Sequence, residues 1–294
     1  MPFFSVCLCA VFVYSVNLYR FIRSYLTLLQ HKETTTMPQT MLTHFGEEQH
    51  QQFMEQGYLS LGHLLDPAAL AALQQRIDDI MLGKIPYPAM RFQLDGTTGE
   101  YNNLPPDSPG HKGATLNYRR ITGLEEDPLF LAHIQHPIIR QLTQRYIGEE
   151  VSIFRAMFMN KPAHHGTVLP WHQDIGEGWG LDRNPIITIW TALDEATAAN
   201  GCMQIVPGSH KLGVLNPQHF VTEADQARYT QEQDVVDLEV AAGEAILLHN
   251  FLLHRSGVNR TSIPRRAFSV AYMDAATQER TTGEVFPQVF GKSA

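Results

Sequence analysis

Apolar residues recur at helical spacing in the first half of the chain. The repeat consists of Leu70, Leu73, Ile77 and Ile80. These positions fall on one face of a helix. Asp66 and Pro67 supply a capping carboxylate and a first-turn proline before it, and Gly83 ends it. A second apolar stripe from Pro128 to Tyr146 contains Pro137 and predicts a broken helix. We expect both helices to pack against a sheet.

The pattern changes at residue 151, where short β-branched or aromatic runs begin to alternate with turn residues such as Asn200-Gly201. This alternation is typical of strands joined by turns. The predicted strands span residues 151–160, 185–193, 203–206, 235–240, 244–248 and 267–273. Because no long helix separates them, they predict an antiparallel sandwich or barrel such as a jelly roll. Before them, residues 47–56 predict a polar helix and residues 57–61 a short strand. The expected fold class is mainly β with flanking helices.

Residues 84–117 fit neither pattern. They contain five prolines and several glycines and few periodic apolar positions. This composition predicts a long loop, of the kind that often carries binding residues.

Residues 3–19 form a nearly uncharged apolar run, closed by Arg20 and Arg23. Its length is at the lower limit for crossing a bilayer. If it spans a membrane, the positive charges leave the rest of the chain on the cytoplasmic side. Alternatively, residues 1–36 are an upstream extension irrelevant to the fold. In both cases we expect one domain over residues 37–294 in the cytoplasm, with membrane contact only through this run.

Net charge and cysteine content limit the classes of function and the compartment that the sequence allows. The 294 residues carry a formal net charge of −8, so no general electrostatic attraction to nucleic acid is expected. Three cysteines form no disulfide framework and favour a reducing compartment.

The chemistry concentrates in Trp171-His172-Gln173-Asp174. On a strand, side chains two residues apart point to one face, so His172 and Asp174 can converge. The motif follows a loop, and we expect it at the start of a strand. A distant histidine would complete two histidines and one carboxylate, the ligand set of non-haem Fe(II) oxygenases. His254 can supply it, and Arg265, which opens the last predicted strand, can place a cation in the same cavity.

Spacing leaves the third ligand open. His249 would point away from the site if its strand continued unbroken to His254. We expect His210 to serve its own turn or the surface, and His164 and His165 to lie exposed in a loop. Spacing alone favours His254 only modestly over His249.

An ordered set of motifs resembles the phytanoyl-CoA dioxygenase family. The matching segments are residues 157–162, 171–174, 190–192, 200–210 and His254 through Ser256, Gly257 and Asn259 to Arg265. The resemblance spans roughly residues 45–275. It implies a double-stranded β-helix (a jelly roll or cupin-like barrel) and dependence on Fe(II), 2-oxoglutarate and O2.

The resemblance also implies roles for individual residues. His172, Asp174 and His254 would be the iron ligands and form the catalytic centre. Arg265 would bind the distal carboxylate of 2-oxoglutarate, for which a planar guanidinium is suited. Further co-substrate contacts would come from Ser256, Trp190, Met157 and Arg120, the last matched across a variable region. Arg266 would face away from the site, and Arg255 departs from the family glycine after the second histidine.

The implied reaction is hydroxylation of a C–H bond in a small organic or acyl substrate, with release of succinate and CO2. Related halogenases have a small residue in place of the carboxylate, so Asp174 favours hydroxylation. An acyl-CoA would need cations for its phosphates, and Arg119, Arg120 and Arg183 are candidates. Two other functions remain open: a cupin-type metalloenzyme that does not use 2-oxoglutarate, and a non-catalytic, membrane-tethered binding protein.

Overall fold

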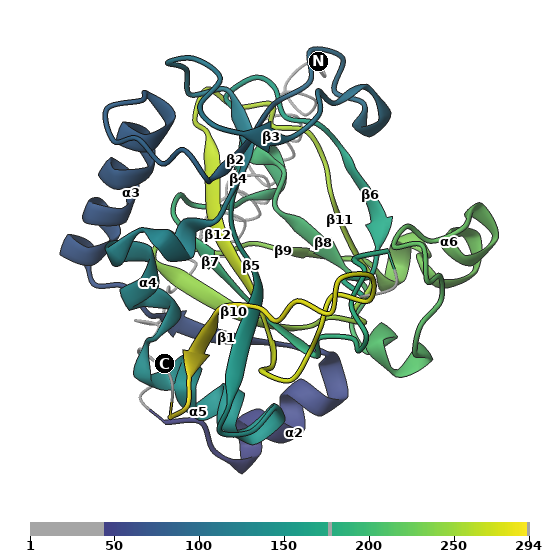
Figure 1. Cartoon of the computed structure of the whole chain (residues 1–294). Coiled ribbons are helices and arrows are strands. Elements are labelled where there is room, and N and C mark those ends of the chain that lie inside the picture. The colour runs from purple at the N-terminus through teal and green to yellow at the C-terminus, as the bar shows by residue number, and fades with distance from the viewer. Residues whose placement is uncertain (1–43, 176–177, 293–294) are drawn as a thin grey trace, which may run out of the picture. The chain divides into compact units, whose positions relative to one another are not determined.

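The computed structural model describes residues 44–175 and 178–292 (Figure 1). The apolar run 3–19 and the predicted boundary at residues 36 and 37 lie outside these ranges. Thr40–Ala294 forms a compact unit of its own. Within the described residues, no helix is both long and apolar enough to cross a membrane.

Two antiparallel sheets form the body of this unit. The larger has nine strands: β1 (Tyr58–His63), β2 (Arg91–Leu94), β3 (Ser108–Pro109), β4 (Tyr118–Thr122), β5 (Val151–Lys161), β7 (Ile187–Ala192), β10 (Glu244–His249), β12 (Arg265–Asp274) and β13 (Gln288–Phe290). Their order is β1-β10-β7-β12-β5-β4-β2-β3, with β13 paired to β5. The smaller sheet has the order β6-β11-β8-β9. Its strands are β6 (Leu169–His172), β8 (Met203–Ile205), β9 (Val236–Leu238) and β11 (His254–Ser256).

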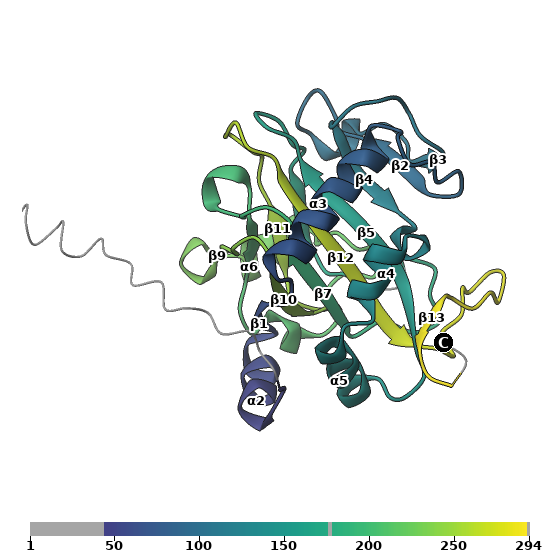
Figure 2. The same cartoon turned by 90° about the vertical axis from the view of Figure 1, so that its left-hand side faces the viewer.

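Helices α3 (Pro67–Met81) and α4 (Pro128–Ile134) lie across the outer face of the larger sheet, α5 (Pro137–Tyr146) lies towards one end of that face, and α2 (Glu47–Gln56) lies below β1 (Figure 2). Helix α6 (Glu223–Tyr229) lies between β8 and β9 in sequence. Short 3-10 turns occupy η1 (Tyr101–Asn103), η2 (Leu124–Glu126), η3 (Ala198–Asn200), η4 (Ser209–Leu212) and η5 (Glu232–Asp234). The Pro137 break is confirmed, because α4 ends and α5 begins around it.

Alternation along the strands separates two apolar layers. On β7, Ile187 and Ile189 pack into the core beneath the helices, whereas Trp190 belongs to the cluster between the sheets. On β12, Phe268 faces the helices and Ala267 faces the interior in the same way. A strand buried on both faces thus sends every second side chain to the space between the sheets. The expected mainly β jelly roll with flanking helices is confirmed.

The predicted loop at residues 84–117 is partly wrong, since it contains β2, β3 and η1. These strands are only four and two residues long and gain their order from pairing with each other and with β4. Such short edge strands carry too few residues to show a period. Helix α6 was also not predicted.

Candidate metal centre

The smaller sheet brings the two predicted histidine ligands face to face. Strands β6 and β11 pair antiparallel, with His254 directly opposite His172. The expectation that the 171–174 motif opens a strand is wrong, because β6 ends at His172. Asp174 lies beyond the strand, where its backbone N–H donates to the Asn250 carbonyl at 2.8 Å. That hydrogen bond, and not strand periodicity, fixes the backbone that carries the carboxylate.

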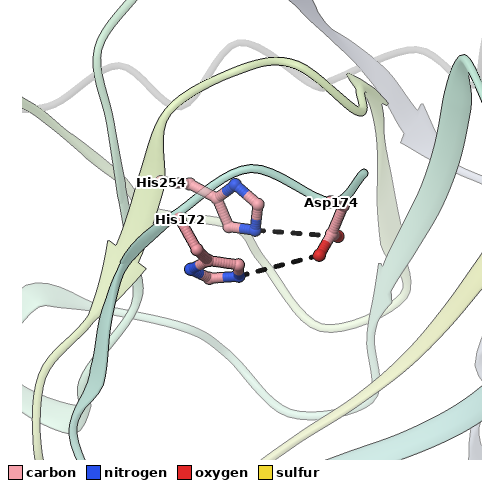
Figure 3. A group of neighbouring side chains, drawn as sticks. All are labelled: His172, Asp174 and His254. Atoms are coloured by element: carbon pink, nitrogen blue, oxygen red, sulfur yellow. Dashed lines mark ion pairs between the residues drawn. The ribbon is translucent and has the colours of Figure 1, made fainter. Parts of the chain in front are cut away.

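The three side chains point toward one another (Figure 3). One Asp174 carboxylate oxygen is 3.7 Å from His172 Nε2, and the other is 3.7 Å from His254 Nε2. One donor atom from each residue lies within 4.8 Å of the other two. This spacing suits three ligands around one ion with coordination bonds near 2 Å.

Backbone carbonyls fix the ring orientation and the tautomer of the two imidazoles. Nδ1 of His172 lies 2.8 Å from the Pro170 carbonyl, and Nδ1 of His254 lies 2.9 Å from the Leu252 carbonyl. Because a carbonyl only accepts, each Nδ1 carries the proton and each Nε2 keeps its lone pair for a ligand bond. Burial, with His254 adding to it, lowers the pKa of His172 well below its ordinary value. A neutral imidazole is the form that binds a metal.

The side-chain amide of Gln173 makes hydrogen bonds to backbone groups of two other segments of the chain. Its Nε2 donates to the carbonyls of Gly213 and Phe251 at 2.8 and 2.7 Å, and its Oε1 accepts from the Leu215 N–H at 2.9 Å. The side chain is fully buried. One amide therefore joins the ligand segment to the segments around residues 213 and 251.

The competing histidines lie elsewhere. Strand β10 ends at His249. The centroid of the His249 ring lies 4.9 Å from the centroid of the His210 ring. His210 is 7% exposed and its Nε2 contacts the Met54 carbonyl at 3.0 Å, so it joins its turn to α2 and is not a surface residue. His164 and His165 are exposed, as expected.

A cavity between the sheets opens beside the three ligands. The cavity together with its open mouth spans about 780 Å³ of space not filled by protein atoms, and His172, Asp174 and His254 lie in its wall. All the predicted co-substrate residues also line it: Arg265, Ser256, Trp190, Met157 and Arg120. The residues predicted from the sequence therefore line one cavity. Their individual roles in binding the co-substrate stay predictions.

Arg265 occupies one end of this cavity. It is 4% exposed and its guanidinium lies over the Trp190 ring, 5.8 Å from the centroid. Its Nε has no hydrogen-bond partner among the described residues. Burial lowers the pKa of Arg265 to about 10, yet the group stays cationic at neutral pH. A smaller recess beside the cavity is lined by Arg265 together with Arg119, Lys161 and Ser256.

The neighbouring residues Arg265 and Arg266 lie on opposite faces of β12. Arg266 lies on the helix side of β12, where it binds Asp194 at 2.8 Å and Asp78 of α3 at 2.6 Å. Arg120 lines the cavity but pairs with Asp107 at 2.8 Å. Of the residues considered for a CoA phosphate, Arg183 lies outside the cavity and is half exposed.

Arg255 lies at the cavity wall without entering the ligand set. Its Nε donates to Gln204 Oε1 at 2.7 Å, and its guanidinium lies over the Trp171 ring.

Sequence reasoning missed several residues in the cavity wall, four of which carry polar or aromatic groups that bear on the site. They are Tyr101, Arg155, Trp179 and His219. Arg155 could have been found from its spacing of two from Met157. His219 has a positive φ of 82°, an uncommon conformation that no sequence pattern here indicates.

Comparison with known proteins agrees with this fold. The family model for phytanoyl-CoA dioxygenase (PhyH) matches residues 53–267. A probable phytanoyl-CoA dioxygenase from Caenorhabditis elegans is 27% identical over 265 residues, covering 81% of each chain. The peroxisomal phytanoyl-CoA dioxygenase of Homo sapiens is 23% identical over 239 residues, which cover 78% of this chain and 68% of the human protein.

Solved structures share the fold at lower identity. EctD from S. alaskensis in its apo form superimposes with a TM-score of 0.63 at 19% identity, covering 82% of both chains. The non-haem, alpha-ketoglutarate-dependent carbocyclase SnoK from nogalamycin biosynthesis gives 0.64 at 20% identity, covering 85% of this chain and 98% of its own. With a family model that matches most of the chain, the sequence belongs to the phytanoyl-CoA dioxygenase family, a family of Fe(II)- and 2-oxoglutarate-dependent oxygenases.

Proposed function

We propose that this enzyme hydroxylates a C–H bond of a small organic or acyl substrate and converts 2-oxoglutarate and O2 to succinate and CO2. One observation carries the proposal. Two histidines and a carboxylate converge in the same cavity that holds a buried arginine without a carboxylate partner among the described residues. The two histidines and the carboxylate fit a non-haem iron, and the arginine fits one carboxylate of a dicarboxylic acid.

His172, Asp174 and His254 would hold the iron. The donor set is chemically suited to Fe(II), because two neutral Nε2 atoms and one carboxylate face a common point and leave other coordination positions open. When bound, iron supplies the activation of O2 that couples oxidation of 2-oxoglutarate to oxidation of the substrate.

The protein residues position the co-substrate. Arg265 would form a bidentate pair with its distal carboxylate, and Ser256 would add a hydroxyl contact in the same recess. Met157, Trp190 and Arg120 contribute cavity wall. Arg119 also lies in this recess and is an additional candidate for the carboxylate.

The Asp174 carboxylate supports hydroxylation in particular. Related halogenases need space for a halide at the position that this side chain occupies. In this chain Asp174 faces both histidine Nε2 atoms at 3.7 Å, so the position is filled by a ligand group.

Alanine substitution of Asp174 or His254 tests the assignment. We expect each variant to lose stoichiometric iron binding and at least about 100-fold of its 2-oxoglutarate-dependent succinate formation, because an open site with two ligands holds the metal weakly. Metal content and succinate release are measured on purified, iron-loaded protein. His165→Ala is the matched control, since His165 is exposed. Full iron content and turnover in either ligand variant would contradict the proposal.

A further inference from the structure

Arg155 is a partly buried cation that the proposed reaction does not use. It lies on β5 with the same strand parity as Met157 and Met159, and all three line the cavity. The register against β12 shifts here: Ala271 faces Arg155 but Tyr272 faces Ile153, so Phe154 is an extra residue on β5. A bulge of this kind places two neighbouring side chains on one side of the strand.

Aromatic rings hold the guanidinium in place. It lies 4.3 Å from the centroid of the Phe154 ring and 5.6 Å from that of Trp179. The two rings stack on each other 4.9 Å apart with an angle of 20° between their planes. Such contacts fix the orientation of an arginine but leave its N–H donors free.

Arg155 lacks the carboxylate partner that several other arginines have. Arginines 76, 91, 120, 145, 183 and 266 each have a carboxylate oxygen within 4.0 Å. Among the described residues, no carboxylate lies that close to Arg155, and burial lowers its pKa to about 10. Even partial burial of an arginine without an anion costs free energy. The cavity wall therefore offers a partly buried guanidinium that has no carboxylate partner among the described residues.

This cation is well separated from Arg265. Arg265 faces Lys161 on β5, six residues along the strand from Arg155, which corresponds to about 20 Å between backbone positions. The charged side chains near enough to influence the pKa of Arg155 are Arg120, Asp174 and Asp107, whereas those that influence the pKa of Arg265 are Arg119 and Asp194. A five-carbon diacid held at Arg265 and the metal would leave Arg155 free.

We propose that Arg155 binds a carboxylate of the primary substrate and so selects small organic acids whose oxidised C–H bond lies near that anionic group. This inference rests on the proposed function, because it assigns the second anion to the molecule that is hydroxylated. Arg155 lies on the Asp174 side of the cavity, where the bidentate pair would orient the acid next to the metal ligands. A CoA thioester has no carboxylate at this point and would lack the pair.

The test compares wild type with Arg155→Gln, Arg155→Lys and the control Arg183→Gln, whose half-exposed side chain lies outside the cavity. Short-, medium- and long-chain carboxylic acids are each paired with the primary amide and the CoA thioester. Succinate release gives kcat/KM, and the KM for 2-oxoglutarate is measured in parallel. Calorimetry on the same proteins measures acid and amide binding without requiring turnover.

We expect at least one acid to bind and to stimulate turnover about 10- to 100-fold better than its amide, the usual effect of a hydrogen bond to a charged group. Arg155→Gln should lose this preference while the KM for 2-oxoglutarate changes less than about twofold, and Arg155→Lys should recover part of it.

Three results would overturn the inference: acid preference that persists in Arg155→Gln, a substrate amide or thioester used as well as its acid, or no acid that binds. Failure of the proposed function looks different. In that case wild type consumes no 2-oxoglutarate with any compound, and calorimetry still decides whether Arg155 binds an acid.

Discussion

Arg265 and Arg266 are neighbours in sequence with opposite environments. Strand alternation sends Arg265 into the cavity and Arg266 to the helix side, where two carboxylates neutralise it. The same residue type therefore has two separable tasks, and substitution at the two positions should produce two separable defects.

Arg265→Ala should raise the KM for 2-oxoglutarate by about 100-fold or more with little change in stability, because it removes a charged bidentate contact. Arg266→Ala should leave that KM unchanged but lower the free energy of unfolding by about 3 kcal/mol, since Asp194 stays buried without its partner. Co-substrate kinetics and urea unfolding of both variants test this. Equal effects of the two substitutions on KM would show that strand face does not divide their roles.

His133 supplies a pH-dependent contribution to stability far from the metal ligands. It is buried in α4 with its Nε2 2.9 Å from the Thr191 hydroxyl, and burial lowers its pKa from 6.5 to about 4. Below pH 6.5 the unfolded chain takes up a proton that the folded chain does not, so stability falls as pH drops toward 4.

At pH 5 this loss amounts to about 2 kcal/mol for His133. His249, whose pKa is also lowered to about 4, adds to the same pH window. Urea unfolding of wild type and His133→Gln at pH 7 and pH 5 isolates the contribution. The drop in unfolding free energy between these pH values should be about 2 kcal/mol smaller in the variant, and an unchanged drop would exclude His133 as a source.

At the scale of the elements, two aspartates that begin helices differ in burial. Asp66 caps α3 at the surface by accepting from the Ala69 N–H at 2.8 Å. Asp127 caps α4 but is fully buried and also binds Arg76 and the Tyr87 hydroxyl, each at 2.7 Å. The buried cap joins the start of one helix to two other segments.

Asp66→Ala should lower the unfolding free energy by about 1 kcal/mol, the usual cost of losing an exposed cap. Asp127→Ala should cost about 3–5 kcal/mol, because it leaves a cation and a hydroxyl without their acceptor. Thermal and urea unfolding of the two variants give the comparison. Similar losses would mean that the network around Asp127 adds nothing to the cap itself.

The elements could be predicted where sequence alone carries the signal. Helices with proline starts and strands rich in β-branched residues were found with small shifts in their ends. Strands β2 and β3 were missed because tertiary pairing orders them. The candidate iron ligands could be named from motifs, but the position of Asp174 depends on the Asn250 carbonyl, and Arg155 enters the cavity next to a bulge. Neither interaction leaves a periodic pattern.

For the molecule as a whole, the predicted domain 37–294 can be tested directly. Thr40–Ala294 is a compact unit in itself, and the candidate metal ligands and the cavity-lining residues all lie within it. A chain that begins at Met37 should therefore bind iron and 2-oxoglutarate with affinities within about twofold of the full chain. Calorimetry and thermal unfolding of both chains check this. A large loss of affinity or stability on truncation would contradict the domain assignment.

The amide of Gln173 also has a consequence for the order of events in time. Its three hydrogen bonds join the segments on either side of the ligands, and they require no ion. The backbone N–H groups of Asp174 and Leu215 are engaged in hydrogen bonds in the same arrangement. Their exchange with deuterated solvent should already be slow in metal-free protein, and Gln173→Ala should accelerate it. Iron would then enter a site whose ligands are already in position, and capture of the ion would not wait for the chain to rearrange.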